Sequence, residues 1–266
     1  MSIRALYTAA TGMDAMQFKL DNTANNLANA ATTAFKRQRV NFEDLYYQHF
    51  RLPGMLDNQS QYTATGVALG LGTRVNSTQQ NFIQGSLNDT GNTLDVAIVG
   101  DGFFQVQDGN QFLYTRAGNF SLNQQGQIIM TSADRGRMLE PAITVPQDTT
   151  QISINQDGFV YVMTPGNPQL QQVGQIQLVR FQNEQGLLAV GENLFQQTDA
   201  SGQPLQSVPG QNGVGVLRQG FLELSNVEPV TELVDLITTQ RTFELNSQVM
   251  QSADQTLQTI ANLRRY

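Results

Sequence analysis

The sequence predicts an α+β protein in which N- and C-terminal helices form a coiled coil, with a central, mainly β domain between them. Three observations lead to this prediction: an apolar heptad repeat at the start, a second one at the end, and short alternating runs between them. The expected ranges are a helix over 1–30, an extended or β connecting region over 31–75, a β domain over 76–224 and a helix over 225–266.

The first thirty residues carry a seam of mostly apolar side chains whose spacing alternates between three and four. Its members are Ile3, Leu6, Ala10, Met13, Gln17, Leu20, Ala24 and Leu27, and only Gln17 breaks the apolar pattern. A seam of this period, kept over more than three repeats, is typical of a coiled coil. The period alone leaves open an ordinary amphipathic helix that packs on its own domain.

The last forty residues carry a second seam. Residues seven apart are apolar (Leu236, Phe243, Met250 and Leu257), and a second row interleaves with them (Thr239, Asn246, Ala253 and Ile260). Pro229 suits the first turn of a helix, because a proline lacks only an N–H that is unpaired there in any case. Both seams are too narrow for the core of a bundle. We therefore expect the two helices to pair, with further burial against neighbouring molecules.

Between these helices the pattern changes to short apolar-polar alternation, as in residues 94–98, 152–154, 159–162 and 173–178. Turn pairs separate such runs: Asp108-Gly109, Asp157-Gly158, Ser201-Gly202 and Asn212-Gly213. This combination is typical of β-hairpins, because these pairs adopt the tight turns that join antiparallel strands.

Composition excludes several classes of function. The net charge is −7 and no basic stripe exists, so nucleic acid is not an expected partner. The chain has no cysteine, which excludes disulfides and Cys-ligated metals. No apolar run approaches the roughly 20 residues of a membrane span, and Thr8, Thr11 and Asp14 interrupt any Sec-type signal core. We expect neither membrane insertion nor a Sec signal peptide.

No catalytic, cofactor-binding or metal site is expected. His49 is the one histidine, it has no nucleophile motif beside it, and a single histidine cannot build a typical zinc site. Gly100-Asp101-Gly102 resembles part of a dinucleotide loop, but a strand-like run follows where a helix is needed, so a tight turn is the better interpretation. A basic cluster next to Phe35 (Lys36, Arg37 and Arg39) is expected to form a contact surface.

Several motifs resemble one known family. Residues 24–29 (Ala-Asn-Asn-Leu-Ala-Asn) with Thr32 and 35–38 (Phe-Lys-Arg-Gln) are similar to the N-terminal motif of flagellar rod and hook proteins. Residues 94–98, 102–106 and 114–120 resemble their shared β motif, and 225–227 and 240–246 resemble their C-terminal helix. One departure is Ala34, where the family usually has Gly. That turn is expected to differ, because Ala resists positive φ.

The resemblance implies a self-assembling structural subunit of the bacterial flagellar rod and not an enzyme. It implies export as an unfolded chain through the flagellar export apparatus, and terminal helices that order only in the growing helical tube. Implied partners are further copies, neighbouring rod and hook-side proteins, and the ring proteins of the outer membrane and peptidoglycan. The residues expected to carry assembly are Ile3, Leu6, Met13, Leu20, Asn25, Asn26, Leu27, Asn29, Phe35, Lys36, Arg37, Leu236, Phe243, Asn246, Met250, Leu257 and Ile260.

Within the family, residues 46–64 are similar to the extra stretch of the distal rod type, so the expected product is a rigid drive shaft in the periplasm-spanning part of the basal body. One alternative is the other full-length rod subunit, on the proximal side. A remote alternative is a β domain that binds a ligand or carbohydrate, which clustered exposed aromatic residues would favour.

Overall fold

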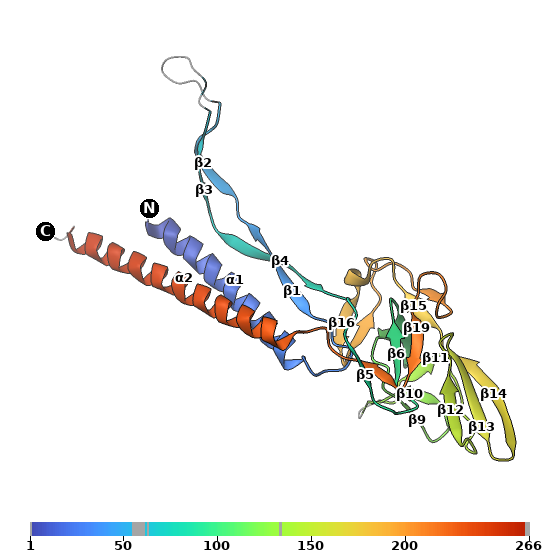
Figure 1. The fold of residues 1–266 in the computed structure, drawn as a ribbon. Coiled ribbons are helices and arrows are strands. Elements are labelled where there is room, and N and C mark those ends of the chain that lie inside the picture. The colour runs from blue at the N-terminus through green and yellow to red at the C-terminus, as the bar shows by residue number, and fades with distance from the viewer. Residues whose placement is uncertain (1, 55–61, 63, 133–134, 264–266) are drawn as a thin grey trace. The chain divides into compact units, whose positions relative to one another are not determined.

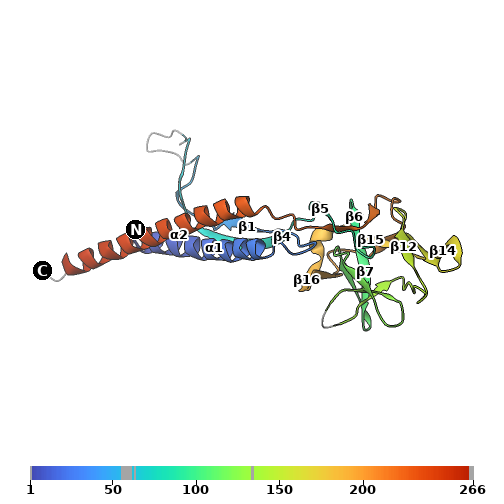
Figure 2. The same cartoon turned by 60° about the horizontal axis from the view of Figure 1, so that its bottom comes forward.

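The computed structural model describes residues 2–54, 62, 64–132 and 135–263. Their chain forms two compact units (Figures 1 and 2). The helical unit comprises the described residues of 1–28, 38–80 and 228–266, and the β unit comprises those of 29–37 and 81–227. The sequence-based ranges place residues 31–37 in the connecting region, whereas here they cluster with the β unit. The α+β class, with a helix at each end of a mainly β region, is confirmed.

Two long helices form the base of the helical unit. Helix α1 (Ser2–Ala28) and helix α2 (Pro229–Leu263) lie side by side along most of the length of α1 (Figures 1 and 2). Asn26 meets Glu232, and Gly12 approaches Asn246, so the helices run antiparallel. Pro229 is the first residue of α2, at the position where a proline costs a helix no hydrogen bond.

A β ribbon completes the helical unit. Strand β1 (Gln38–Asp44) pairs with β4 (Thr73–Gln80), and further along the ribbon β2 (Tyr47–Arg51) pairs with β3 (Val67–Gly70), all antiparallel. Strands β1 and β4 pack on α1. The approach is close at Gly72, where a Cβ would lie 2.2 Å from the Thr11 hydroxyl, so only glycine fits there.

The β unit contains sixteen short strands, β5 to β20, and one 3₁₀ turn. The strands are β5 (Leu87–Asp89), β6 (Val96–Val99), β7 (Phe103–Asp108), β8 (Gln111–Thr115), β9 (Phe120–Leu122), β10 (Ile128–Met130), β11 (Met138–Glu140), β12 (Gln151–Ile154), β13 (Phe159–Thr164), β14 (Asn167–Gln175), β15 (Leu178–Arg180), β16 (Leu188–Gly191), β17 (Leu194–Gln196), β18 (Leu205–Ser207), β19 (Val216–Gln219) and β20 (Phe221–Glu223). The turn η1 (Glu184–Gly186) precedes β16.

Strand β7 is the centre of the largest sheet, whose order is β16-β17-β8-β7-β11-β10-β9. It pairs with β8 through the tight turn at Asp108-Gly109, where Gly109 has a φ of 62°, and it pairs on its other edge with both β11 and β15. Strand β18 pairs with β15 in the same sheet. Strands β12, β13 and β14 form a separate meander, and the remaining strands pair as β6 with β19 and β5 with β20. Strands from both ends of the β unit are therefore hydrogen-bonded to each other.

The core of the β unit is apolar and aromatic. One cluster is aliphatic around Phe104, which meets Phe120 edge to face at 5.1 Å between ring centroids. A second cluster is built on Phe103, whose ring meets those of Phe82, Phe181 and Phe195 at 5.5 to 5.9 Å. Phe103 and Phe104 are adjacent on β7 and fully buried, so the two faces of one strand hold the two clusters together.

Ala34 adopts a φ of 57° and is buried, and its N–H donates to the carbonyl of Glu223 at 2.8 Å. The left-handed turn is thus kept with an alanine. The expectation that this turn would differ was wrong, because the surrounding hydrogen bonds and packing hold a conformation that costs a non-glycine residue about 1–2 kcal/mol.

Candidate assembly elements and the ion network

The seam predicted on α1 is only partly covered. Leu6, Met13, Leu20 and Leu27 are half-buried, while Gln17 and Ala24 are exposed; the side chain of Ile3 lies outside the described residues. The fully buried residues of α1 are instead Ala9, Ala15, Thr23 and Asn26, which are small or polar. The apolar seam of α1 is therefore not the row of side chains that is most buried in the single chain.

The seam predicted on α2, unlike that of α1, lies on the covered face of its helix. Leu236, Phe243, Asn246, Met250 and Leu257 are half-buried, and only Ile260, near the end of the helix, is exposed. Thr239, in the same seam, is 2% exposed, and Glu232, one heptad before it, is 1% exposed. The covered face of α2 thus coincides with its predicted seam.

A second apolar stripe on α2 was missed by the sequence analysis. Its exposed members are Val230, Leu233, Val234, Ile237, Leu245 and Val249. Their spacing drifts from the heptad, which is why a search for period seven passes over them. Exposed apolar rows of this length are typical of surfaces that take part in binding.

The N-terminal motif divides between the two units. In α1, Asn25 is exposed, Asn26 is buried and Leu27 is half-buried, whereas Asn29 lies in the β unit and is half-buried. Phe35 and Arg37 are half-buried in the β unit, and Lys36 is fully buried there. Lys36 therefore corrects the expectation of a basic contact surface, since its charge is turned into its own domain.

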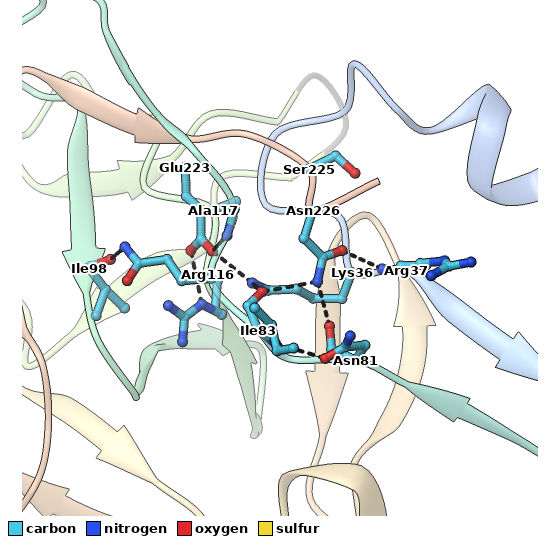
Figure 3. A network of polar contacts seen from close by, with 12 residues as sticks. Lys36, Arg37, Asn81, Ile83, Ile98, Arg116, Ala117, Glu223, Ser225 and Asn226 are labelled. Atoms are coloured by element: carbon cyan, nitrogen blue, oxygen red, sulfur yellow. Dashed lines mark hydrogen bonds and ion pairs between the residues drawn. The ribbon is translucent and has the colours of Figure 1, made fainter. Parts of the chain in front are cut away.

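Lys36 belongs to a buried ion network (Figure 3). Its ammonium donates to the Glu223 carboxylate at 2.7 Å and to the carbonyl of Ile83 at 2.8 Å. The other oxygen of Glu223 accepts a hydrogen bond from Nε of Arg116 at 2.9 Å. The three side chains are at most 1% exposed, so the carboxylate holds two cations away from water.

The loop 100–102 completes the coordination of Arg116. Its two terminal nitrogens donate to the carbonyls of Gly100, at 2.8 Å, and Gly102, at 3.1 Å. These glycines have φ values of 110° and 131°, which other residues adopt only with strain. The tight turn expected at Gly100-Asp101-Gly102 thus serves to aim two carbonyls at a buried guanidinium.

The network shifts the pKa values of its members. Burial, followed by repulsion from Arg116, lowers the pKa of Lys36 to about 8, although Glu223 acts in the opposite direction. Burial alone would raise the pKa of Glu223, but Arg116 and Lys36 outweigh it and hold this pKa below its usual value. At neutral pH, Glu223 is therefore ionised, and its carboxylate can pair with the charged side chains of Lys36 and Arg116.

Asn226 makes a second junction beside this network (Figure 3). Its Oδ1 accepts from the backbone N–H of Arg37 at 2.7 Å, and its Nδ2 donates to the carbonyls of Asn81 at 2.7 Å and Ile83 at 3.0 Å. Three segments far apart in sequence are joined by one amide side chain. Asn226 was quoted in the motif 225–227, but nothing in the sequence indicated this role.

The ribbon strands β2 and β3 are exposed on both faces. Tyr46, Tyr47, Phe50, Val67 and Leu69 are the large side chains exposed there. Strand β2 falls in the predicted stretch 46–64, whereas β3 follows that stretch; residues 55–61 and 63 of the stretch lie outside the described residues. An apolar two-stranded ribbon with free edges is a surface that readily takes up a partner.

The residues that could take part in catalysis do not gather into a catalytic site in the described part of the chain. His49 lies exposed on β2, and Asp95 is buried and accepts hydrogen bonds from Thr90 and Asn92. A cleft of about 580 Å³ contains Glu184, whose pKa is raised by burial and by Asp101, but its described lining has no histidine, serine, cysteine or lysine.

In the described part of the chain, no three His, Cys, Asp or Glu side chains gather closely enough to hold a metal ion. Neither α1 nor α2, as far as it is described, has an apolar stretch with the length and hydropathy that a membrane crossing needs.

Three family models match separate parts of the chain. They are described as flagella basal body rod protein (residues 6–36), flagellar hook protein FlgE/F/G D1 domain (97–162) and flagellar basal body rod FlgEFG protein C-terminal (218–263). Each match contains one member of the ion network, namely Lys36, Arg116 and Glu223 in that order.

Full-length relatives decide the family. The flagellar basal-body rod protein FlgG of Buchnera aphidicola subsp. Acyrthosiphon pisum is 44% identical, with 98% of this chain and 100% of that protein covered. FlgG of Caulobacter vibrioides is also 44% identical over 98% and 100%, and FlgG of Bacillus subtilis is 36% identical over 99% and 100%.

The chain belongs to the FlgG family of flagellar basal-body rod proteins. It is accordingly a structural subunit of the flagellar distal rod, and its place is the flagellar basal body. The FlgG family is a structural class and not a class of enzymes. The family resemblance stated on the motifs is therefore confirmed.

The ion network predicts a large effect of Glu223→Gln. The substitution leaves two buried cations without a carboxylate, and breaking a buried pair in this way typically costs about 3–5 kcal/mol. Urea unfolding of the β unit, followed by near-UV circular dichroism, measures the loss. Glu192→Gln is the matched control, because it removes a half-exposed carboxylate paired with Arg137 in the same unit, where we expect about 0–1 kcal/mol.

The same variant changes the pH dependence. Because the pKa of Glu223 is lowered in the folded state, its contribution is present above about pH 4.5 and is lost as the pH falls through the lower folded value. The acid limb of the stability profile should therefore be shallower in Glu223→Gln than in the native chain. Equal acid limbs, or a loss below about 1 kcal/mol, would show that the network is not what holds the segments together.

Proposed function

We propose that the chain self-assembles into a rigid helical tube, the drive shaft that transmits motor torque to the hook. The observation that carries this proposal is the exposed apolar surface of the two helices. The seam of α1 is half-covered and the second stripe of α2 is bare, although the helices already pack on each other. Each Leu, Met or Phe that becomes fully buried contributes about 1.5–3 kcal/mol, which favours association of copies.

The terminal helices form the inner, coiled-coil part of this tube. Ile3, Leu6, Met13, Leu20 and Leu27 supply a heptad seam to a neighbouring copy, and the seam of α2 (Leu236, Phe243, Asn246, Met250, Leu257 and Ile260) completes the coil. Helices with so much uncovered apolar surface gain order from neighbours, so they become fully ordered only in the polymer. The contact is extended by residues close in sequence to the end of α1, namely Asn25, Asn29, Phe35 and Arg37. The buried side chain of Lys36 anchors this segment to the β unit.

The β unit forms the outer part of the tube. Its charged residues favour neither nucleic acid nor membrane, and a face rich in amides can turn against the ring proteins of the outer membrane and peptidoglycan. Neighbouring rod proteins and hook-side proteins are the partners at the two ends of the tube. The chain reaches this place unfolded through the flagellar export apparatus.

A ligand-binding β domain finds no support in the exposed aromatic residues. Among the described residues, the exposed aromatics gather on α1 and the ribbon, and the β unit contributes only Phe112. A carbohydrate site is usually lined by several aromatic faces, so a single exposed ring does not suggest one.

Substitution of the α1 seam tests assembly. Leu20→Asp places a charge in a seam that must be buried between molecules, so tubes should fail to form while the β unit unfolds at an unchanged temperature. Ala5→Asp adds the same charge at an exposed position of α1 outside the seam and should assemble normally. Assembly is scored by electron microscopy of basal bodies from cells whose own rod gene is deleted. Normal rods with Leu20→Asp would rule out the seam as the interface.

The ribbon is proposed to lie between stacked subunits and to stiffen the tube. A filament reconstruction should show residues 46–64 in contact with a neighbouring copy, with Tyr46, Tyr47 and Phe50 covered. A reconstruction in which the ribbon stays in solvent would remove the argument for stiffening.

A further inference from the structure

One amide side chain joins three elements of the helical unit. Asn26, near the end of α1, is 1% exposed. Its Oδ1 accepts from the backbone N–H of Gln38 at 2.9 Å, and its Nδ2 donates to the carbonyl of the same residue at 2.8 Å. The same Nδ2 donates to Oε2 of Glu232 on α2 at 3.3 Å. Helix α1, strand β1 and helix α2 therefore meet at one residue.

Glu232 is an unusual residue for this position. It lies in the first turn of α2, where the helix dipole favours a carboxylate, but it is only 1% exposed. Burying a carboxylate and an amide costs free energy unless their hydrogen bonds are made. Two leucines would pack the same space without that cost, so the polar pair provides something other than stability.

A second close approach fixes the alignment independently. A Cβ on Gly12 would lie 3.1 Å from Nδ2 of Asn246, so the two helices are nearly in contact at this point. Residues 12 and 26 are 14 apart, and residues 232 and 246 are also 14 apart, which is two heptads on each helix. The two helices therefore keep one register between these points.

Apolar packing alone would not select this register. The seam of α2 repeats every seven residues, so a slip of one heptad brings apolar side chains to equivalent places. Such a slip separates Asn26 from Glu232. In one direction it brings Thr239 opposite Asn26, and in the other it brings Lys19 opposite Glu232, which leaves the amide of Asn26 without its carboxylate.

We propose that Asn26 and Glu232 form a register pin, a buried polar pair that selects one antiparallel alignment of α1 and α2. A single buried polar residue fixes alignment in this way in other coiled coils, at a cost in stability. Asn26 is suited to the role because its amide is already oriented by both backbone groups of Gln38. The pin acts between two helices of one chain and requires no particular arrangement of neighbouring copies.

Cysteine cross-linking tests the register, because the native chain has no thiol. The pair Gly12→Cys with Asn246→Cys reports the native alignment. Gly12→Cys with Ala253→Cys reports a slip of seven residues one way, and Ala5→Cys with Asn246→Cys reports the opposite slip. A short thiol cross-linker is applied to the full chain, both dilute and assembled. An intrachain product appears as a monomer of shifted mobility.

In the native background we expect the Gly12–Asn246 pair to cross-link at least about tenfold more than either slipped pair, because a slip leaves a buried polar group unpaired. With Asn26→Leu and Glu232→Leu added, the helices should remain formed, but the preference should fall below about threefold. The matched control is Thr23→Val with Thr239→Val, two equally buried polar positions where the one hydroxyl bond described, from Thr239, stays within its own helix. It should keep the native preference.

Three results would overturn the register pin. One is an unchanged preference in the Asn26→Leu, Glu232→Leu chain with its helices intact by far-UV circular dichroism. Another is the absence of a Gly12–Asn246 product in the native background, dilute or assembled, because the alignment itself would then not exist. A loss of preference in the Thr→Val control would likewise show that any loss of polarity at this interface releases the register.

Discussion

The carboxylate of Glu223, shared between Lys36 and Arg116 inside the β unit, is the interaction on which the rest of the structure depends. Its partners come from the segment that follows α1 and from the middle of the chain, and Glu223 itself lies on β20, shortly before α2 begins. Burying three charges is favourable only when all of them are present and paired. The β unit is therefore complete only when both ends of its chain are in place.

The sequence predicted the elements better than their partners. The terminal helices and the β region followed from period and turn residues, because local geometry determines both. A period of seven shows that Leu6, Met13 and Leu20 share a face of α1, but it does not show which surface covers that face. The most buried residues of α1 are Ala9, Ala15, Thr23 and Asn26, which are small or polar and which hydrophobicity does not single out.

Lys36, Asn226 and Asn26 show the second limit of sequence reasoning. Lys36 lies close to Arg37 and Arg39 in the sequence, and such a basic cluster predicts exposed side chains. Only the fold reveals that the partner of Lys36, Glu223, lies 187 positions away. The same holds for the amides, since Asn226 meets Arg37 across 189 positions and Asn26 meets Glu232 across 206. Pairings of this separation leave no local periodic signal, although Lys36, Asn226 and Asn26 themselves lie within motifs that resemble the family.

We expect the β unit to be stable in the single chain and the helices to need neighbours, and hydrogen exchange measures this contrast most directly. Amides of β6, β7 and β13 should be protected equally in the dilute chain and in the assembled tube. Amides of α1 and α2 should exchange at least about a hundredfold more slowly in the tube than in the dilute chain, as segments of low local stability do when a partner covers them. Equal protection of both helices in the two states would contradict the account.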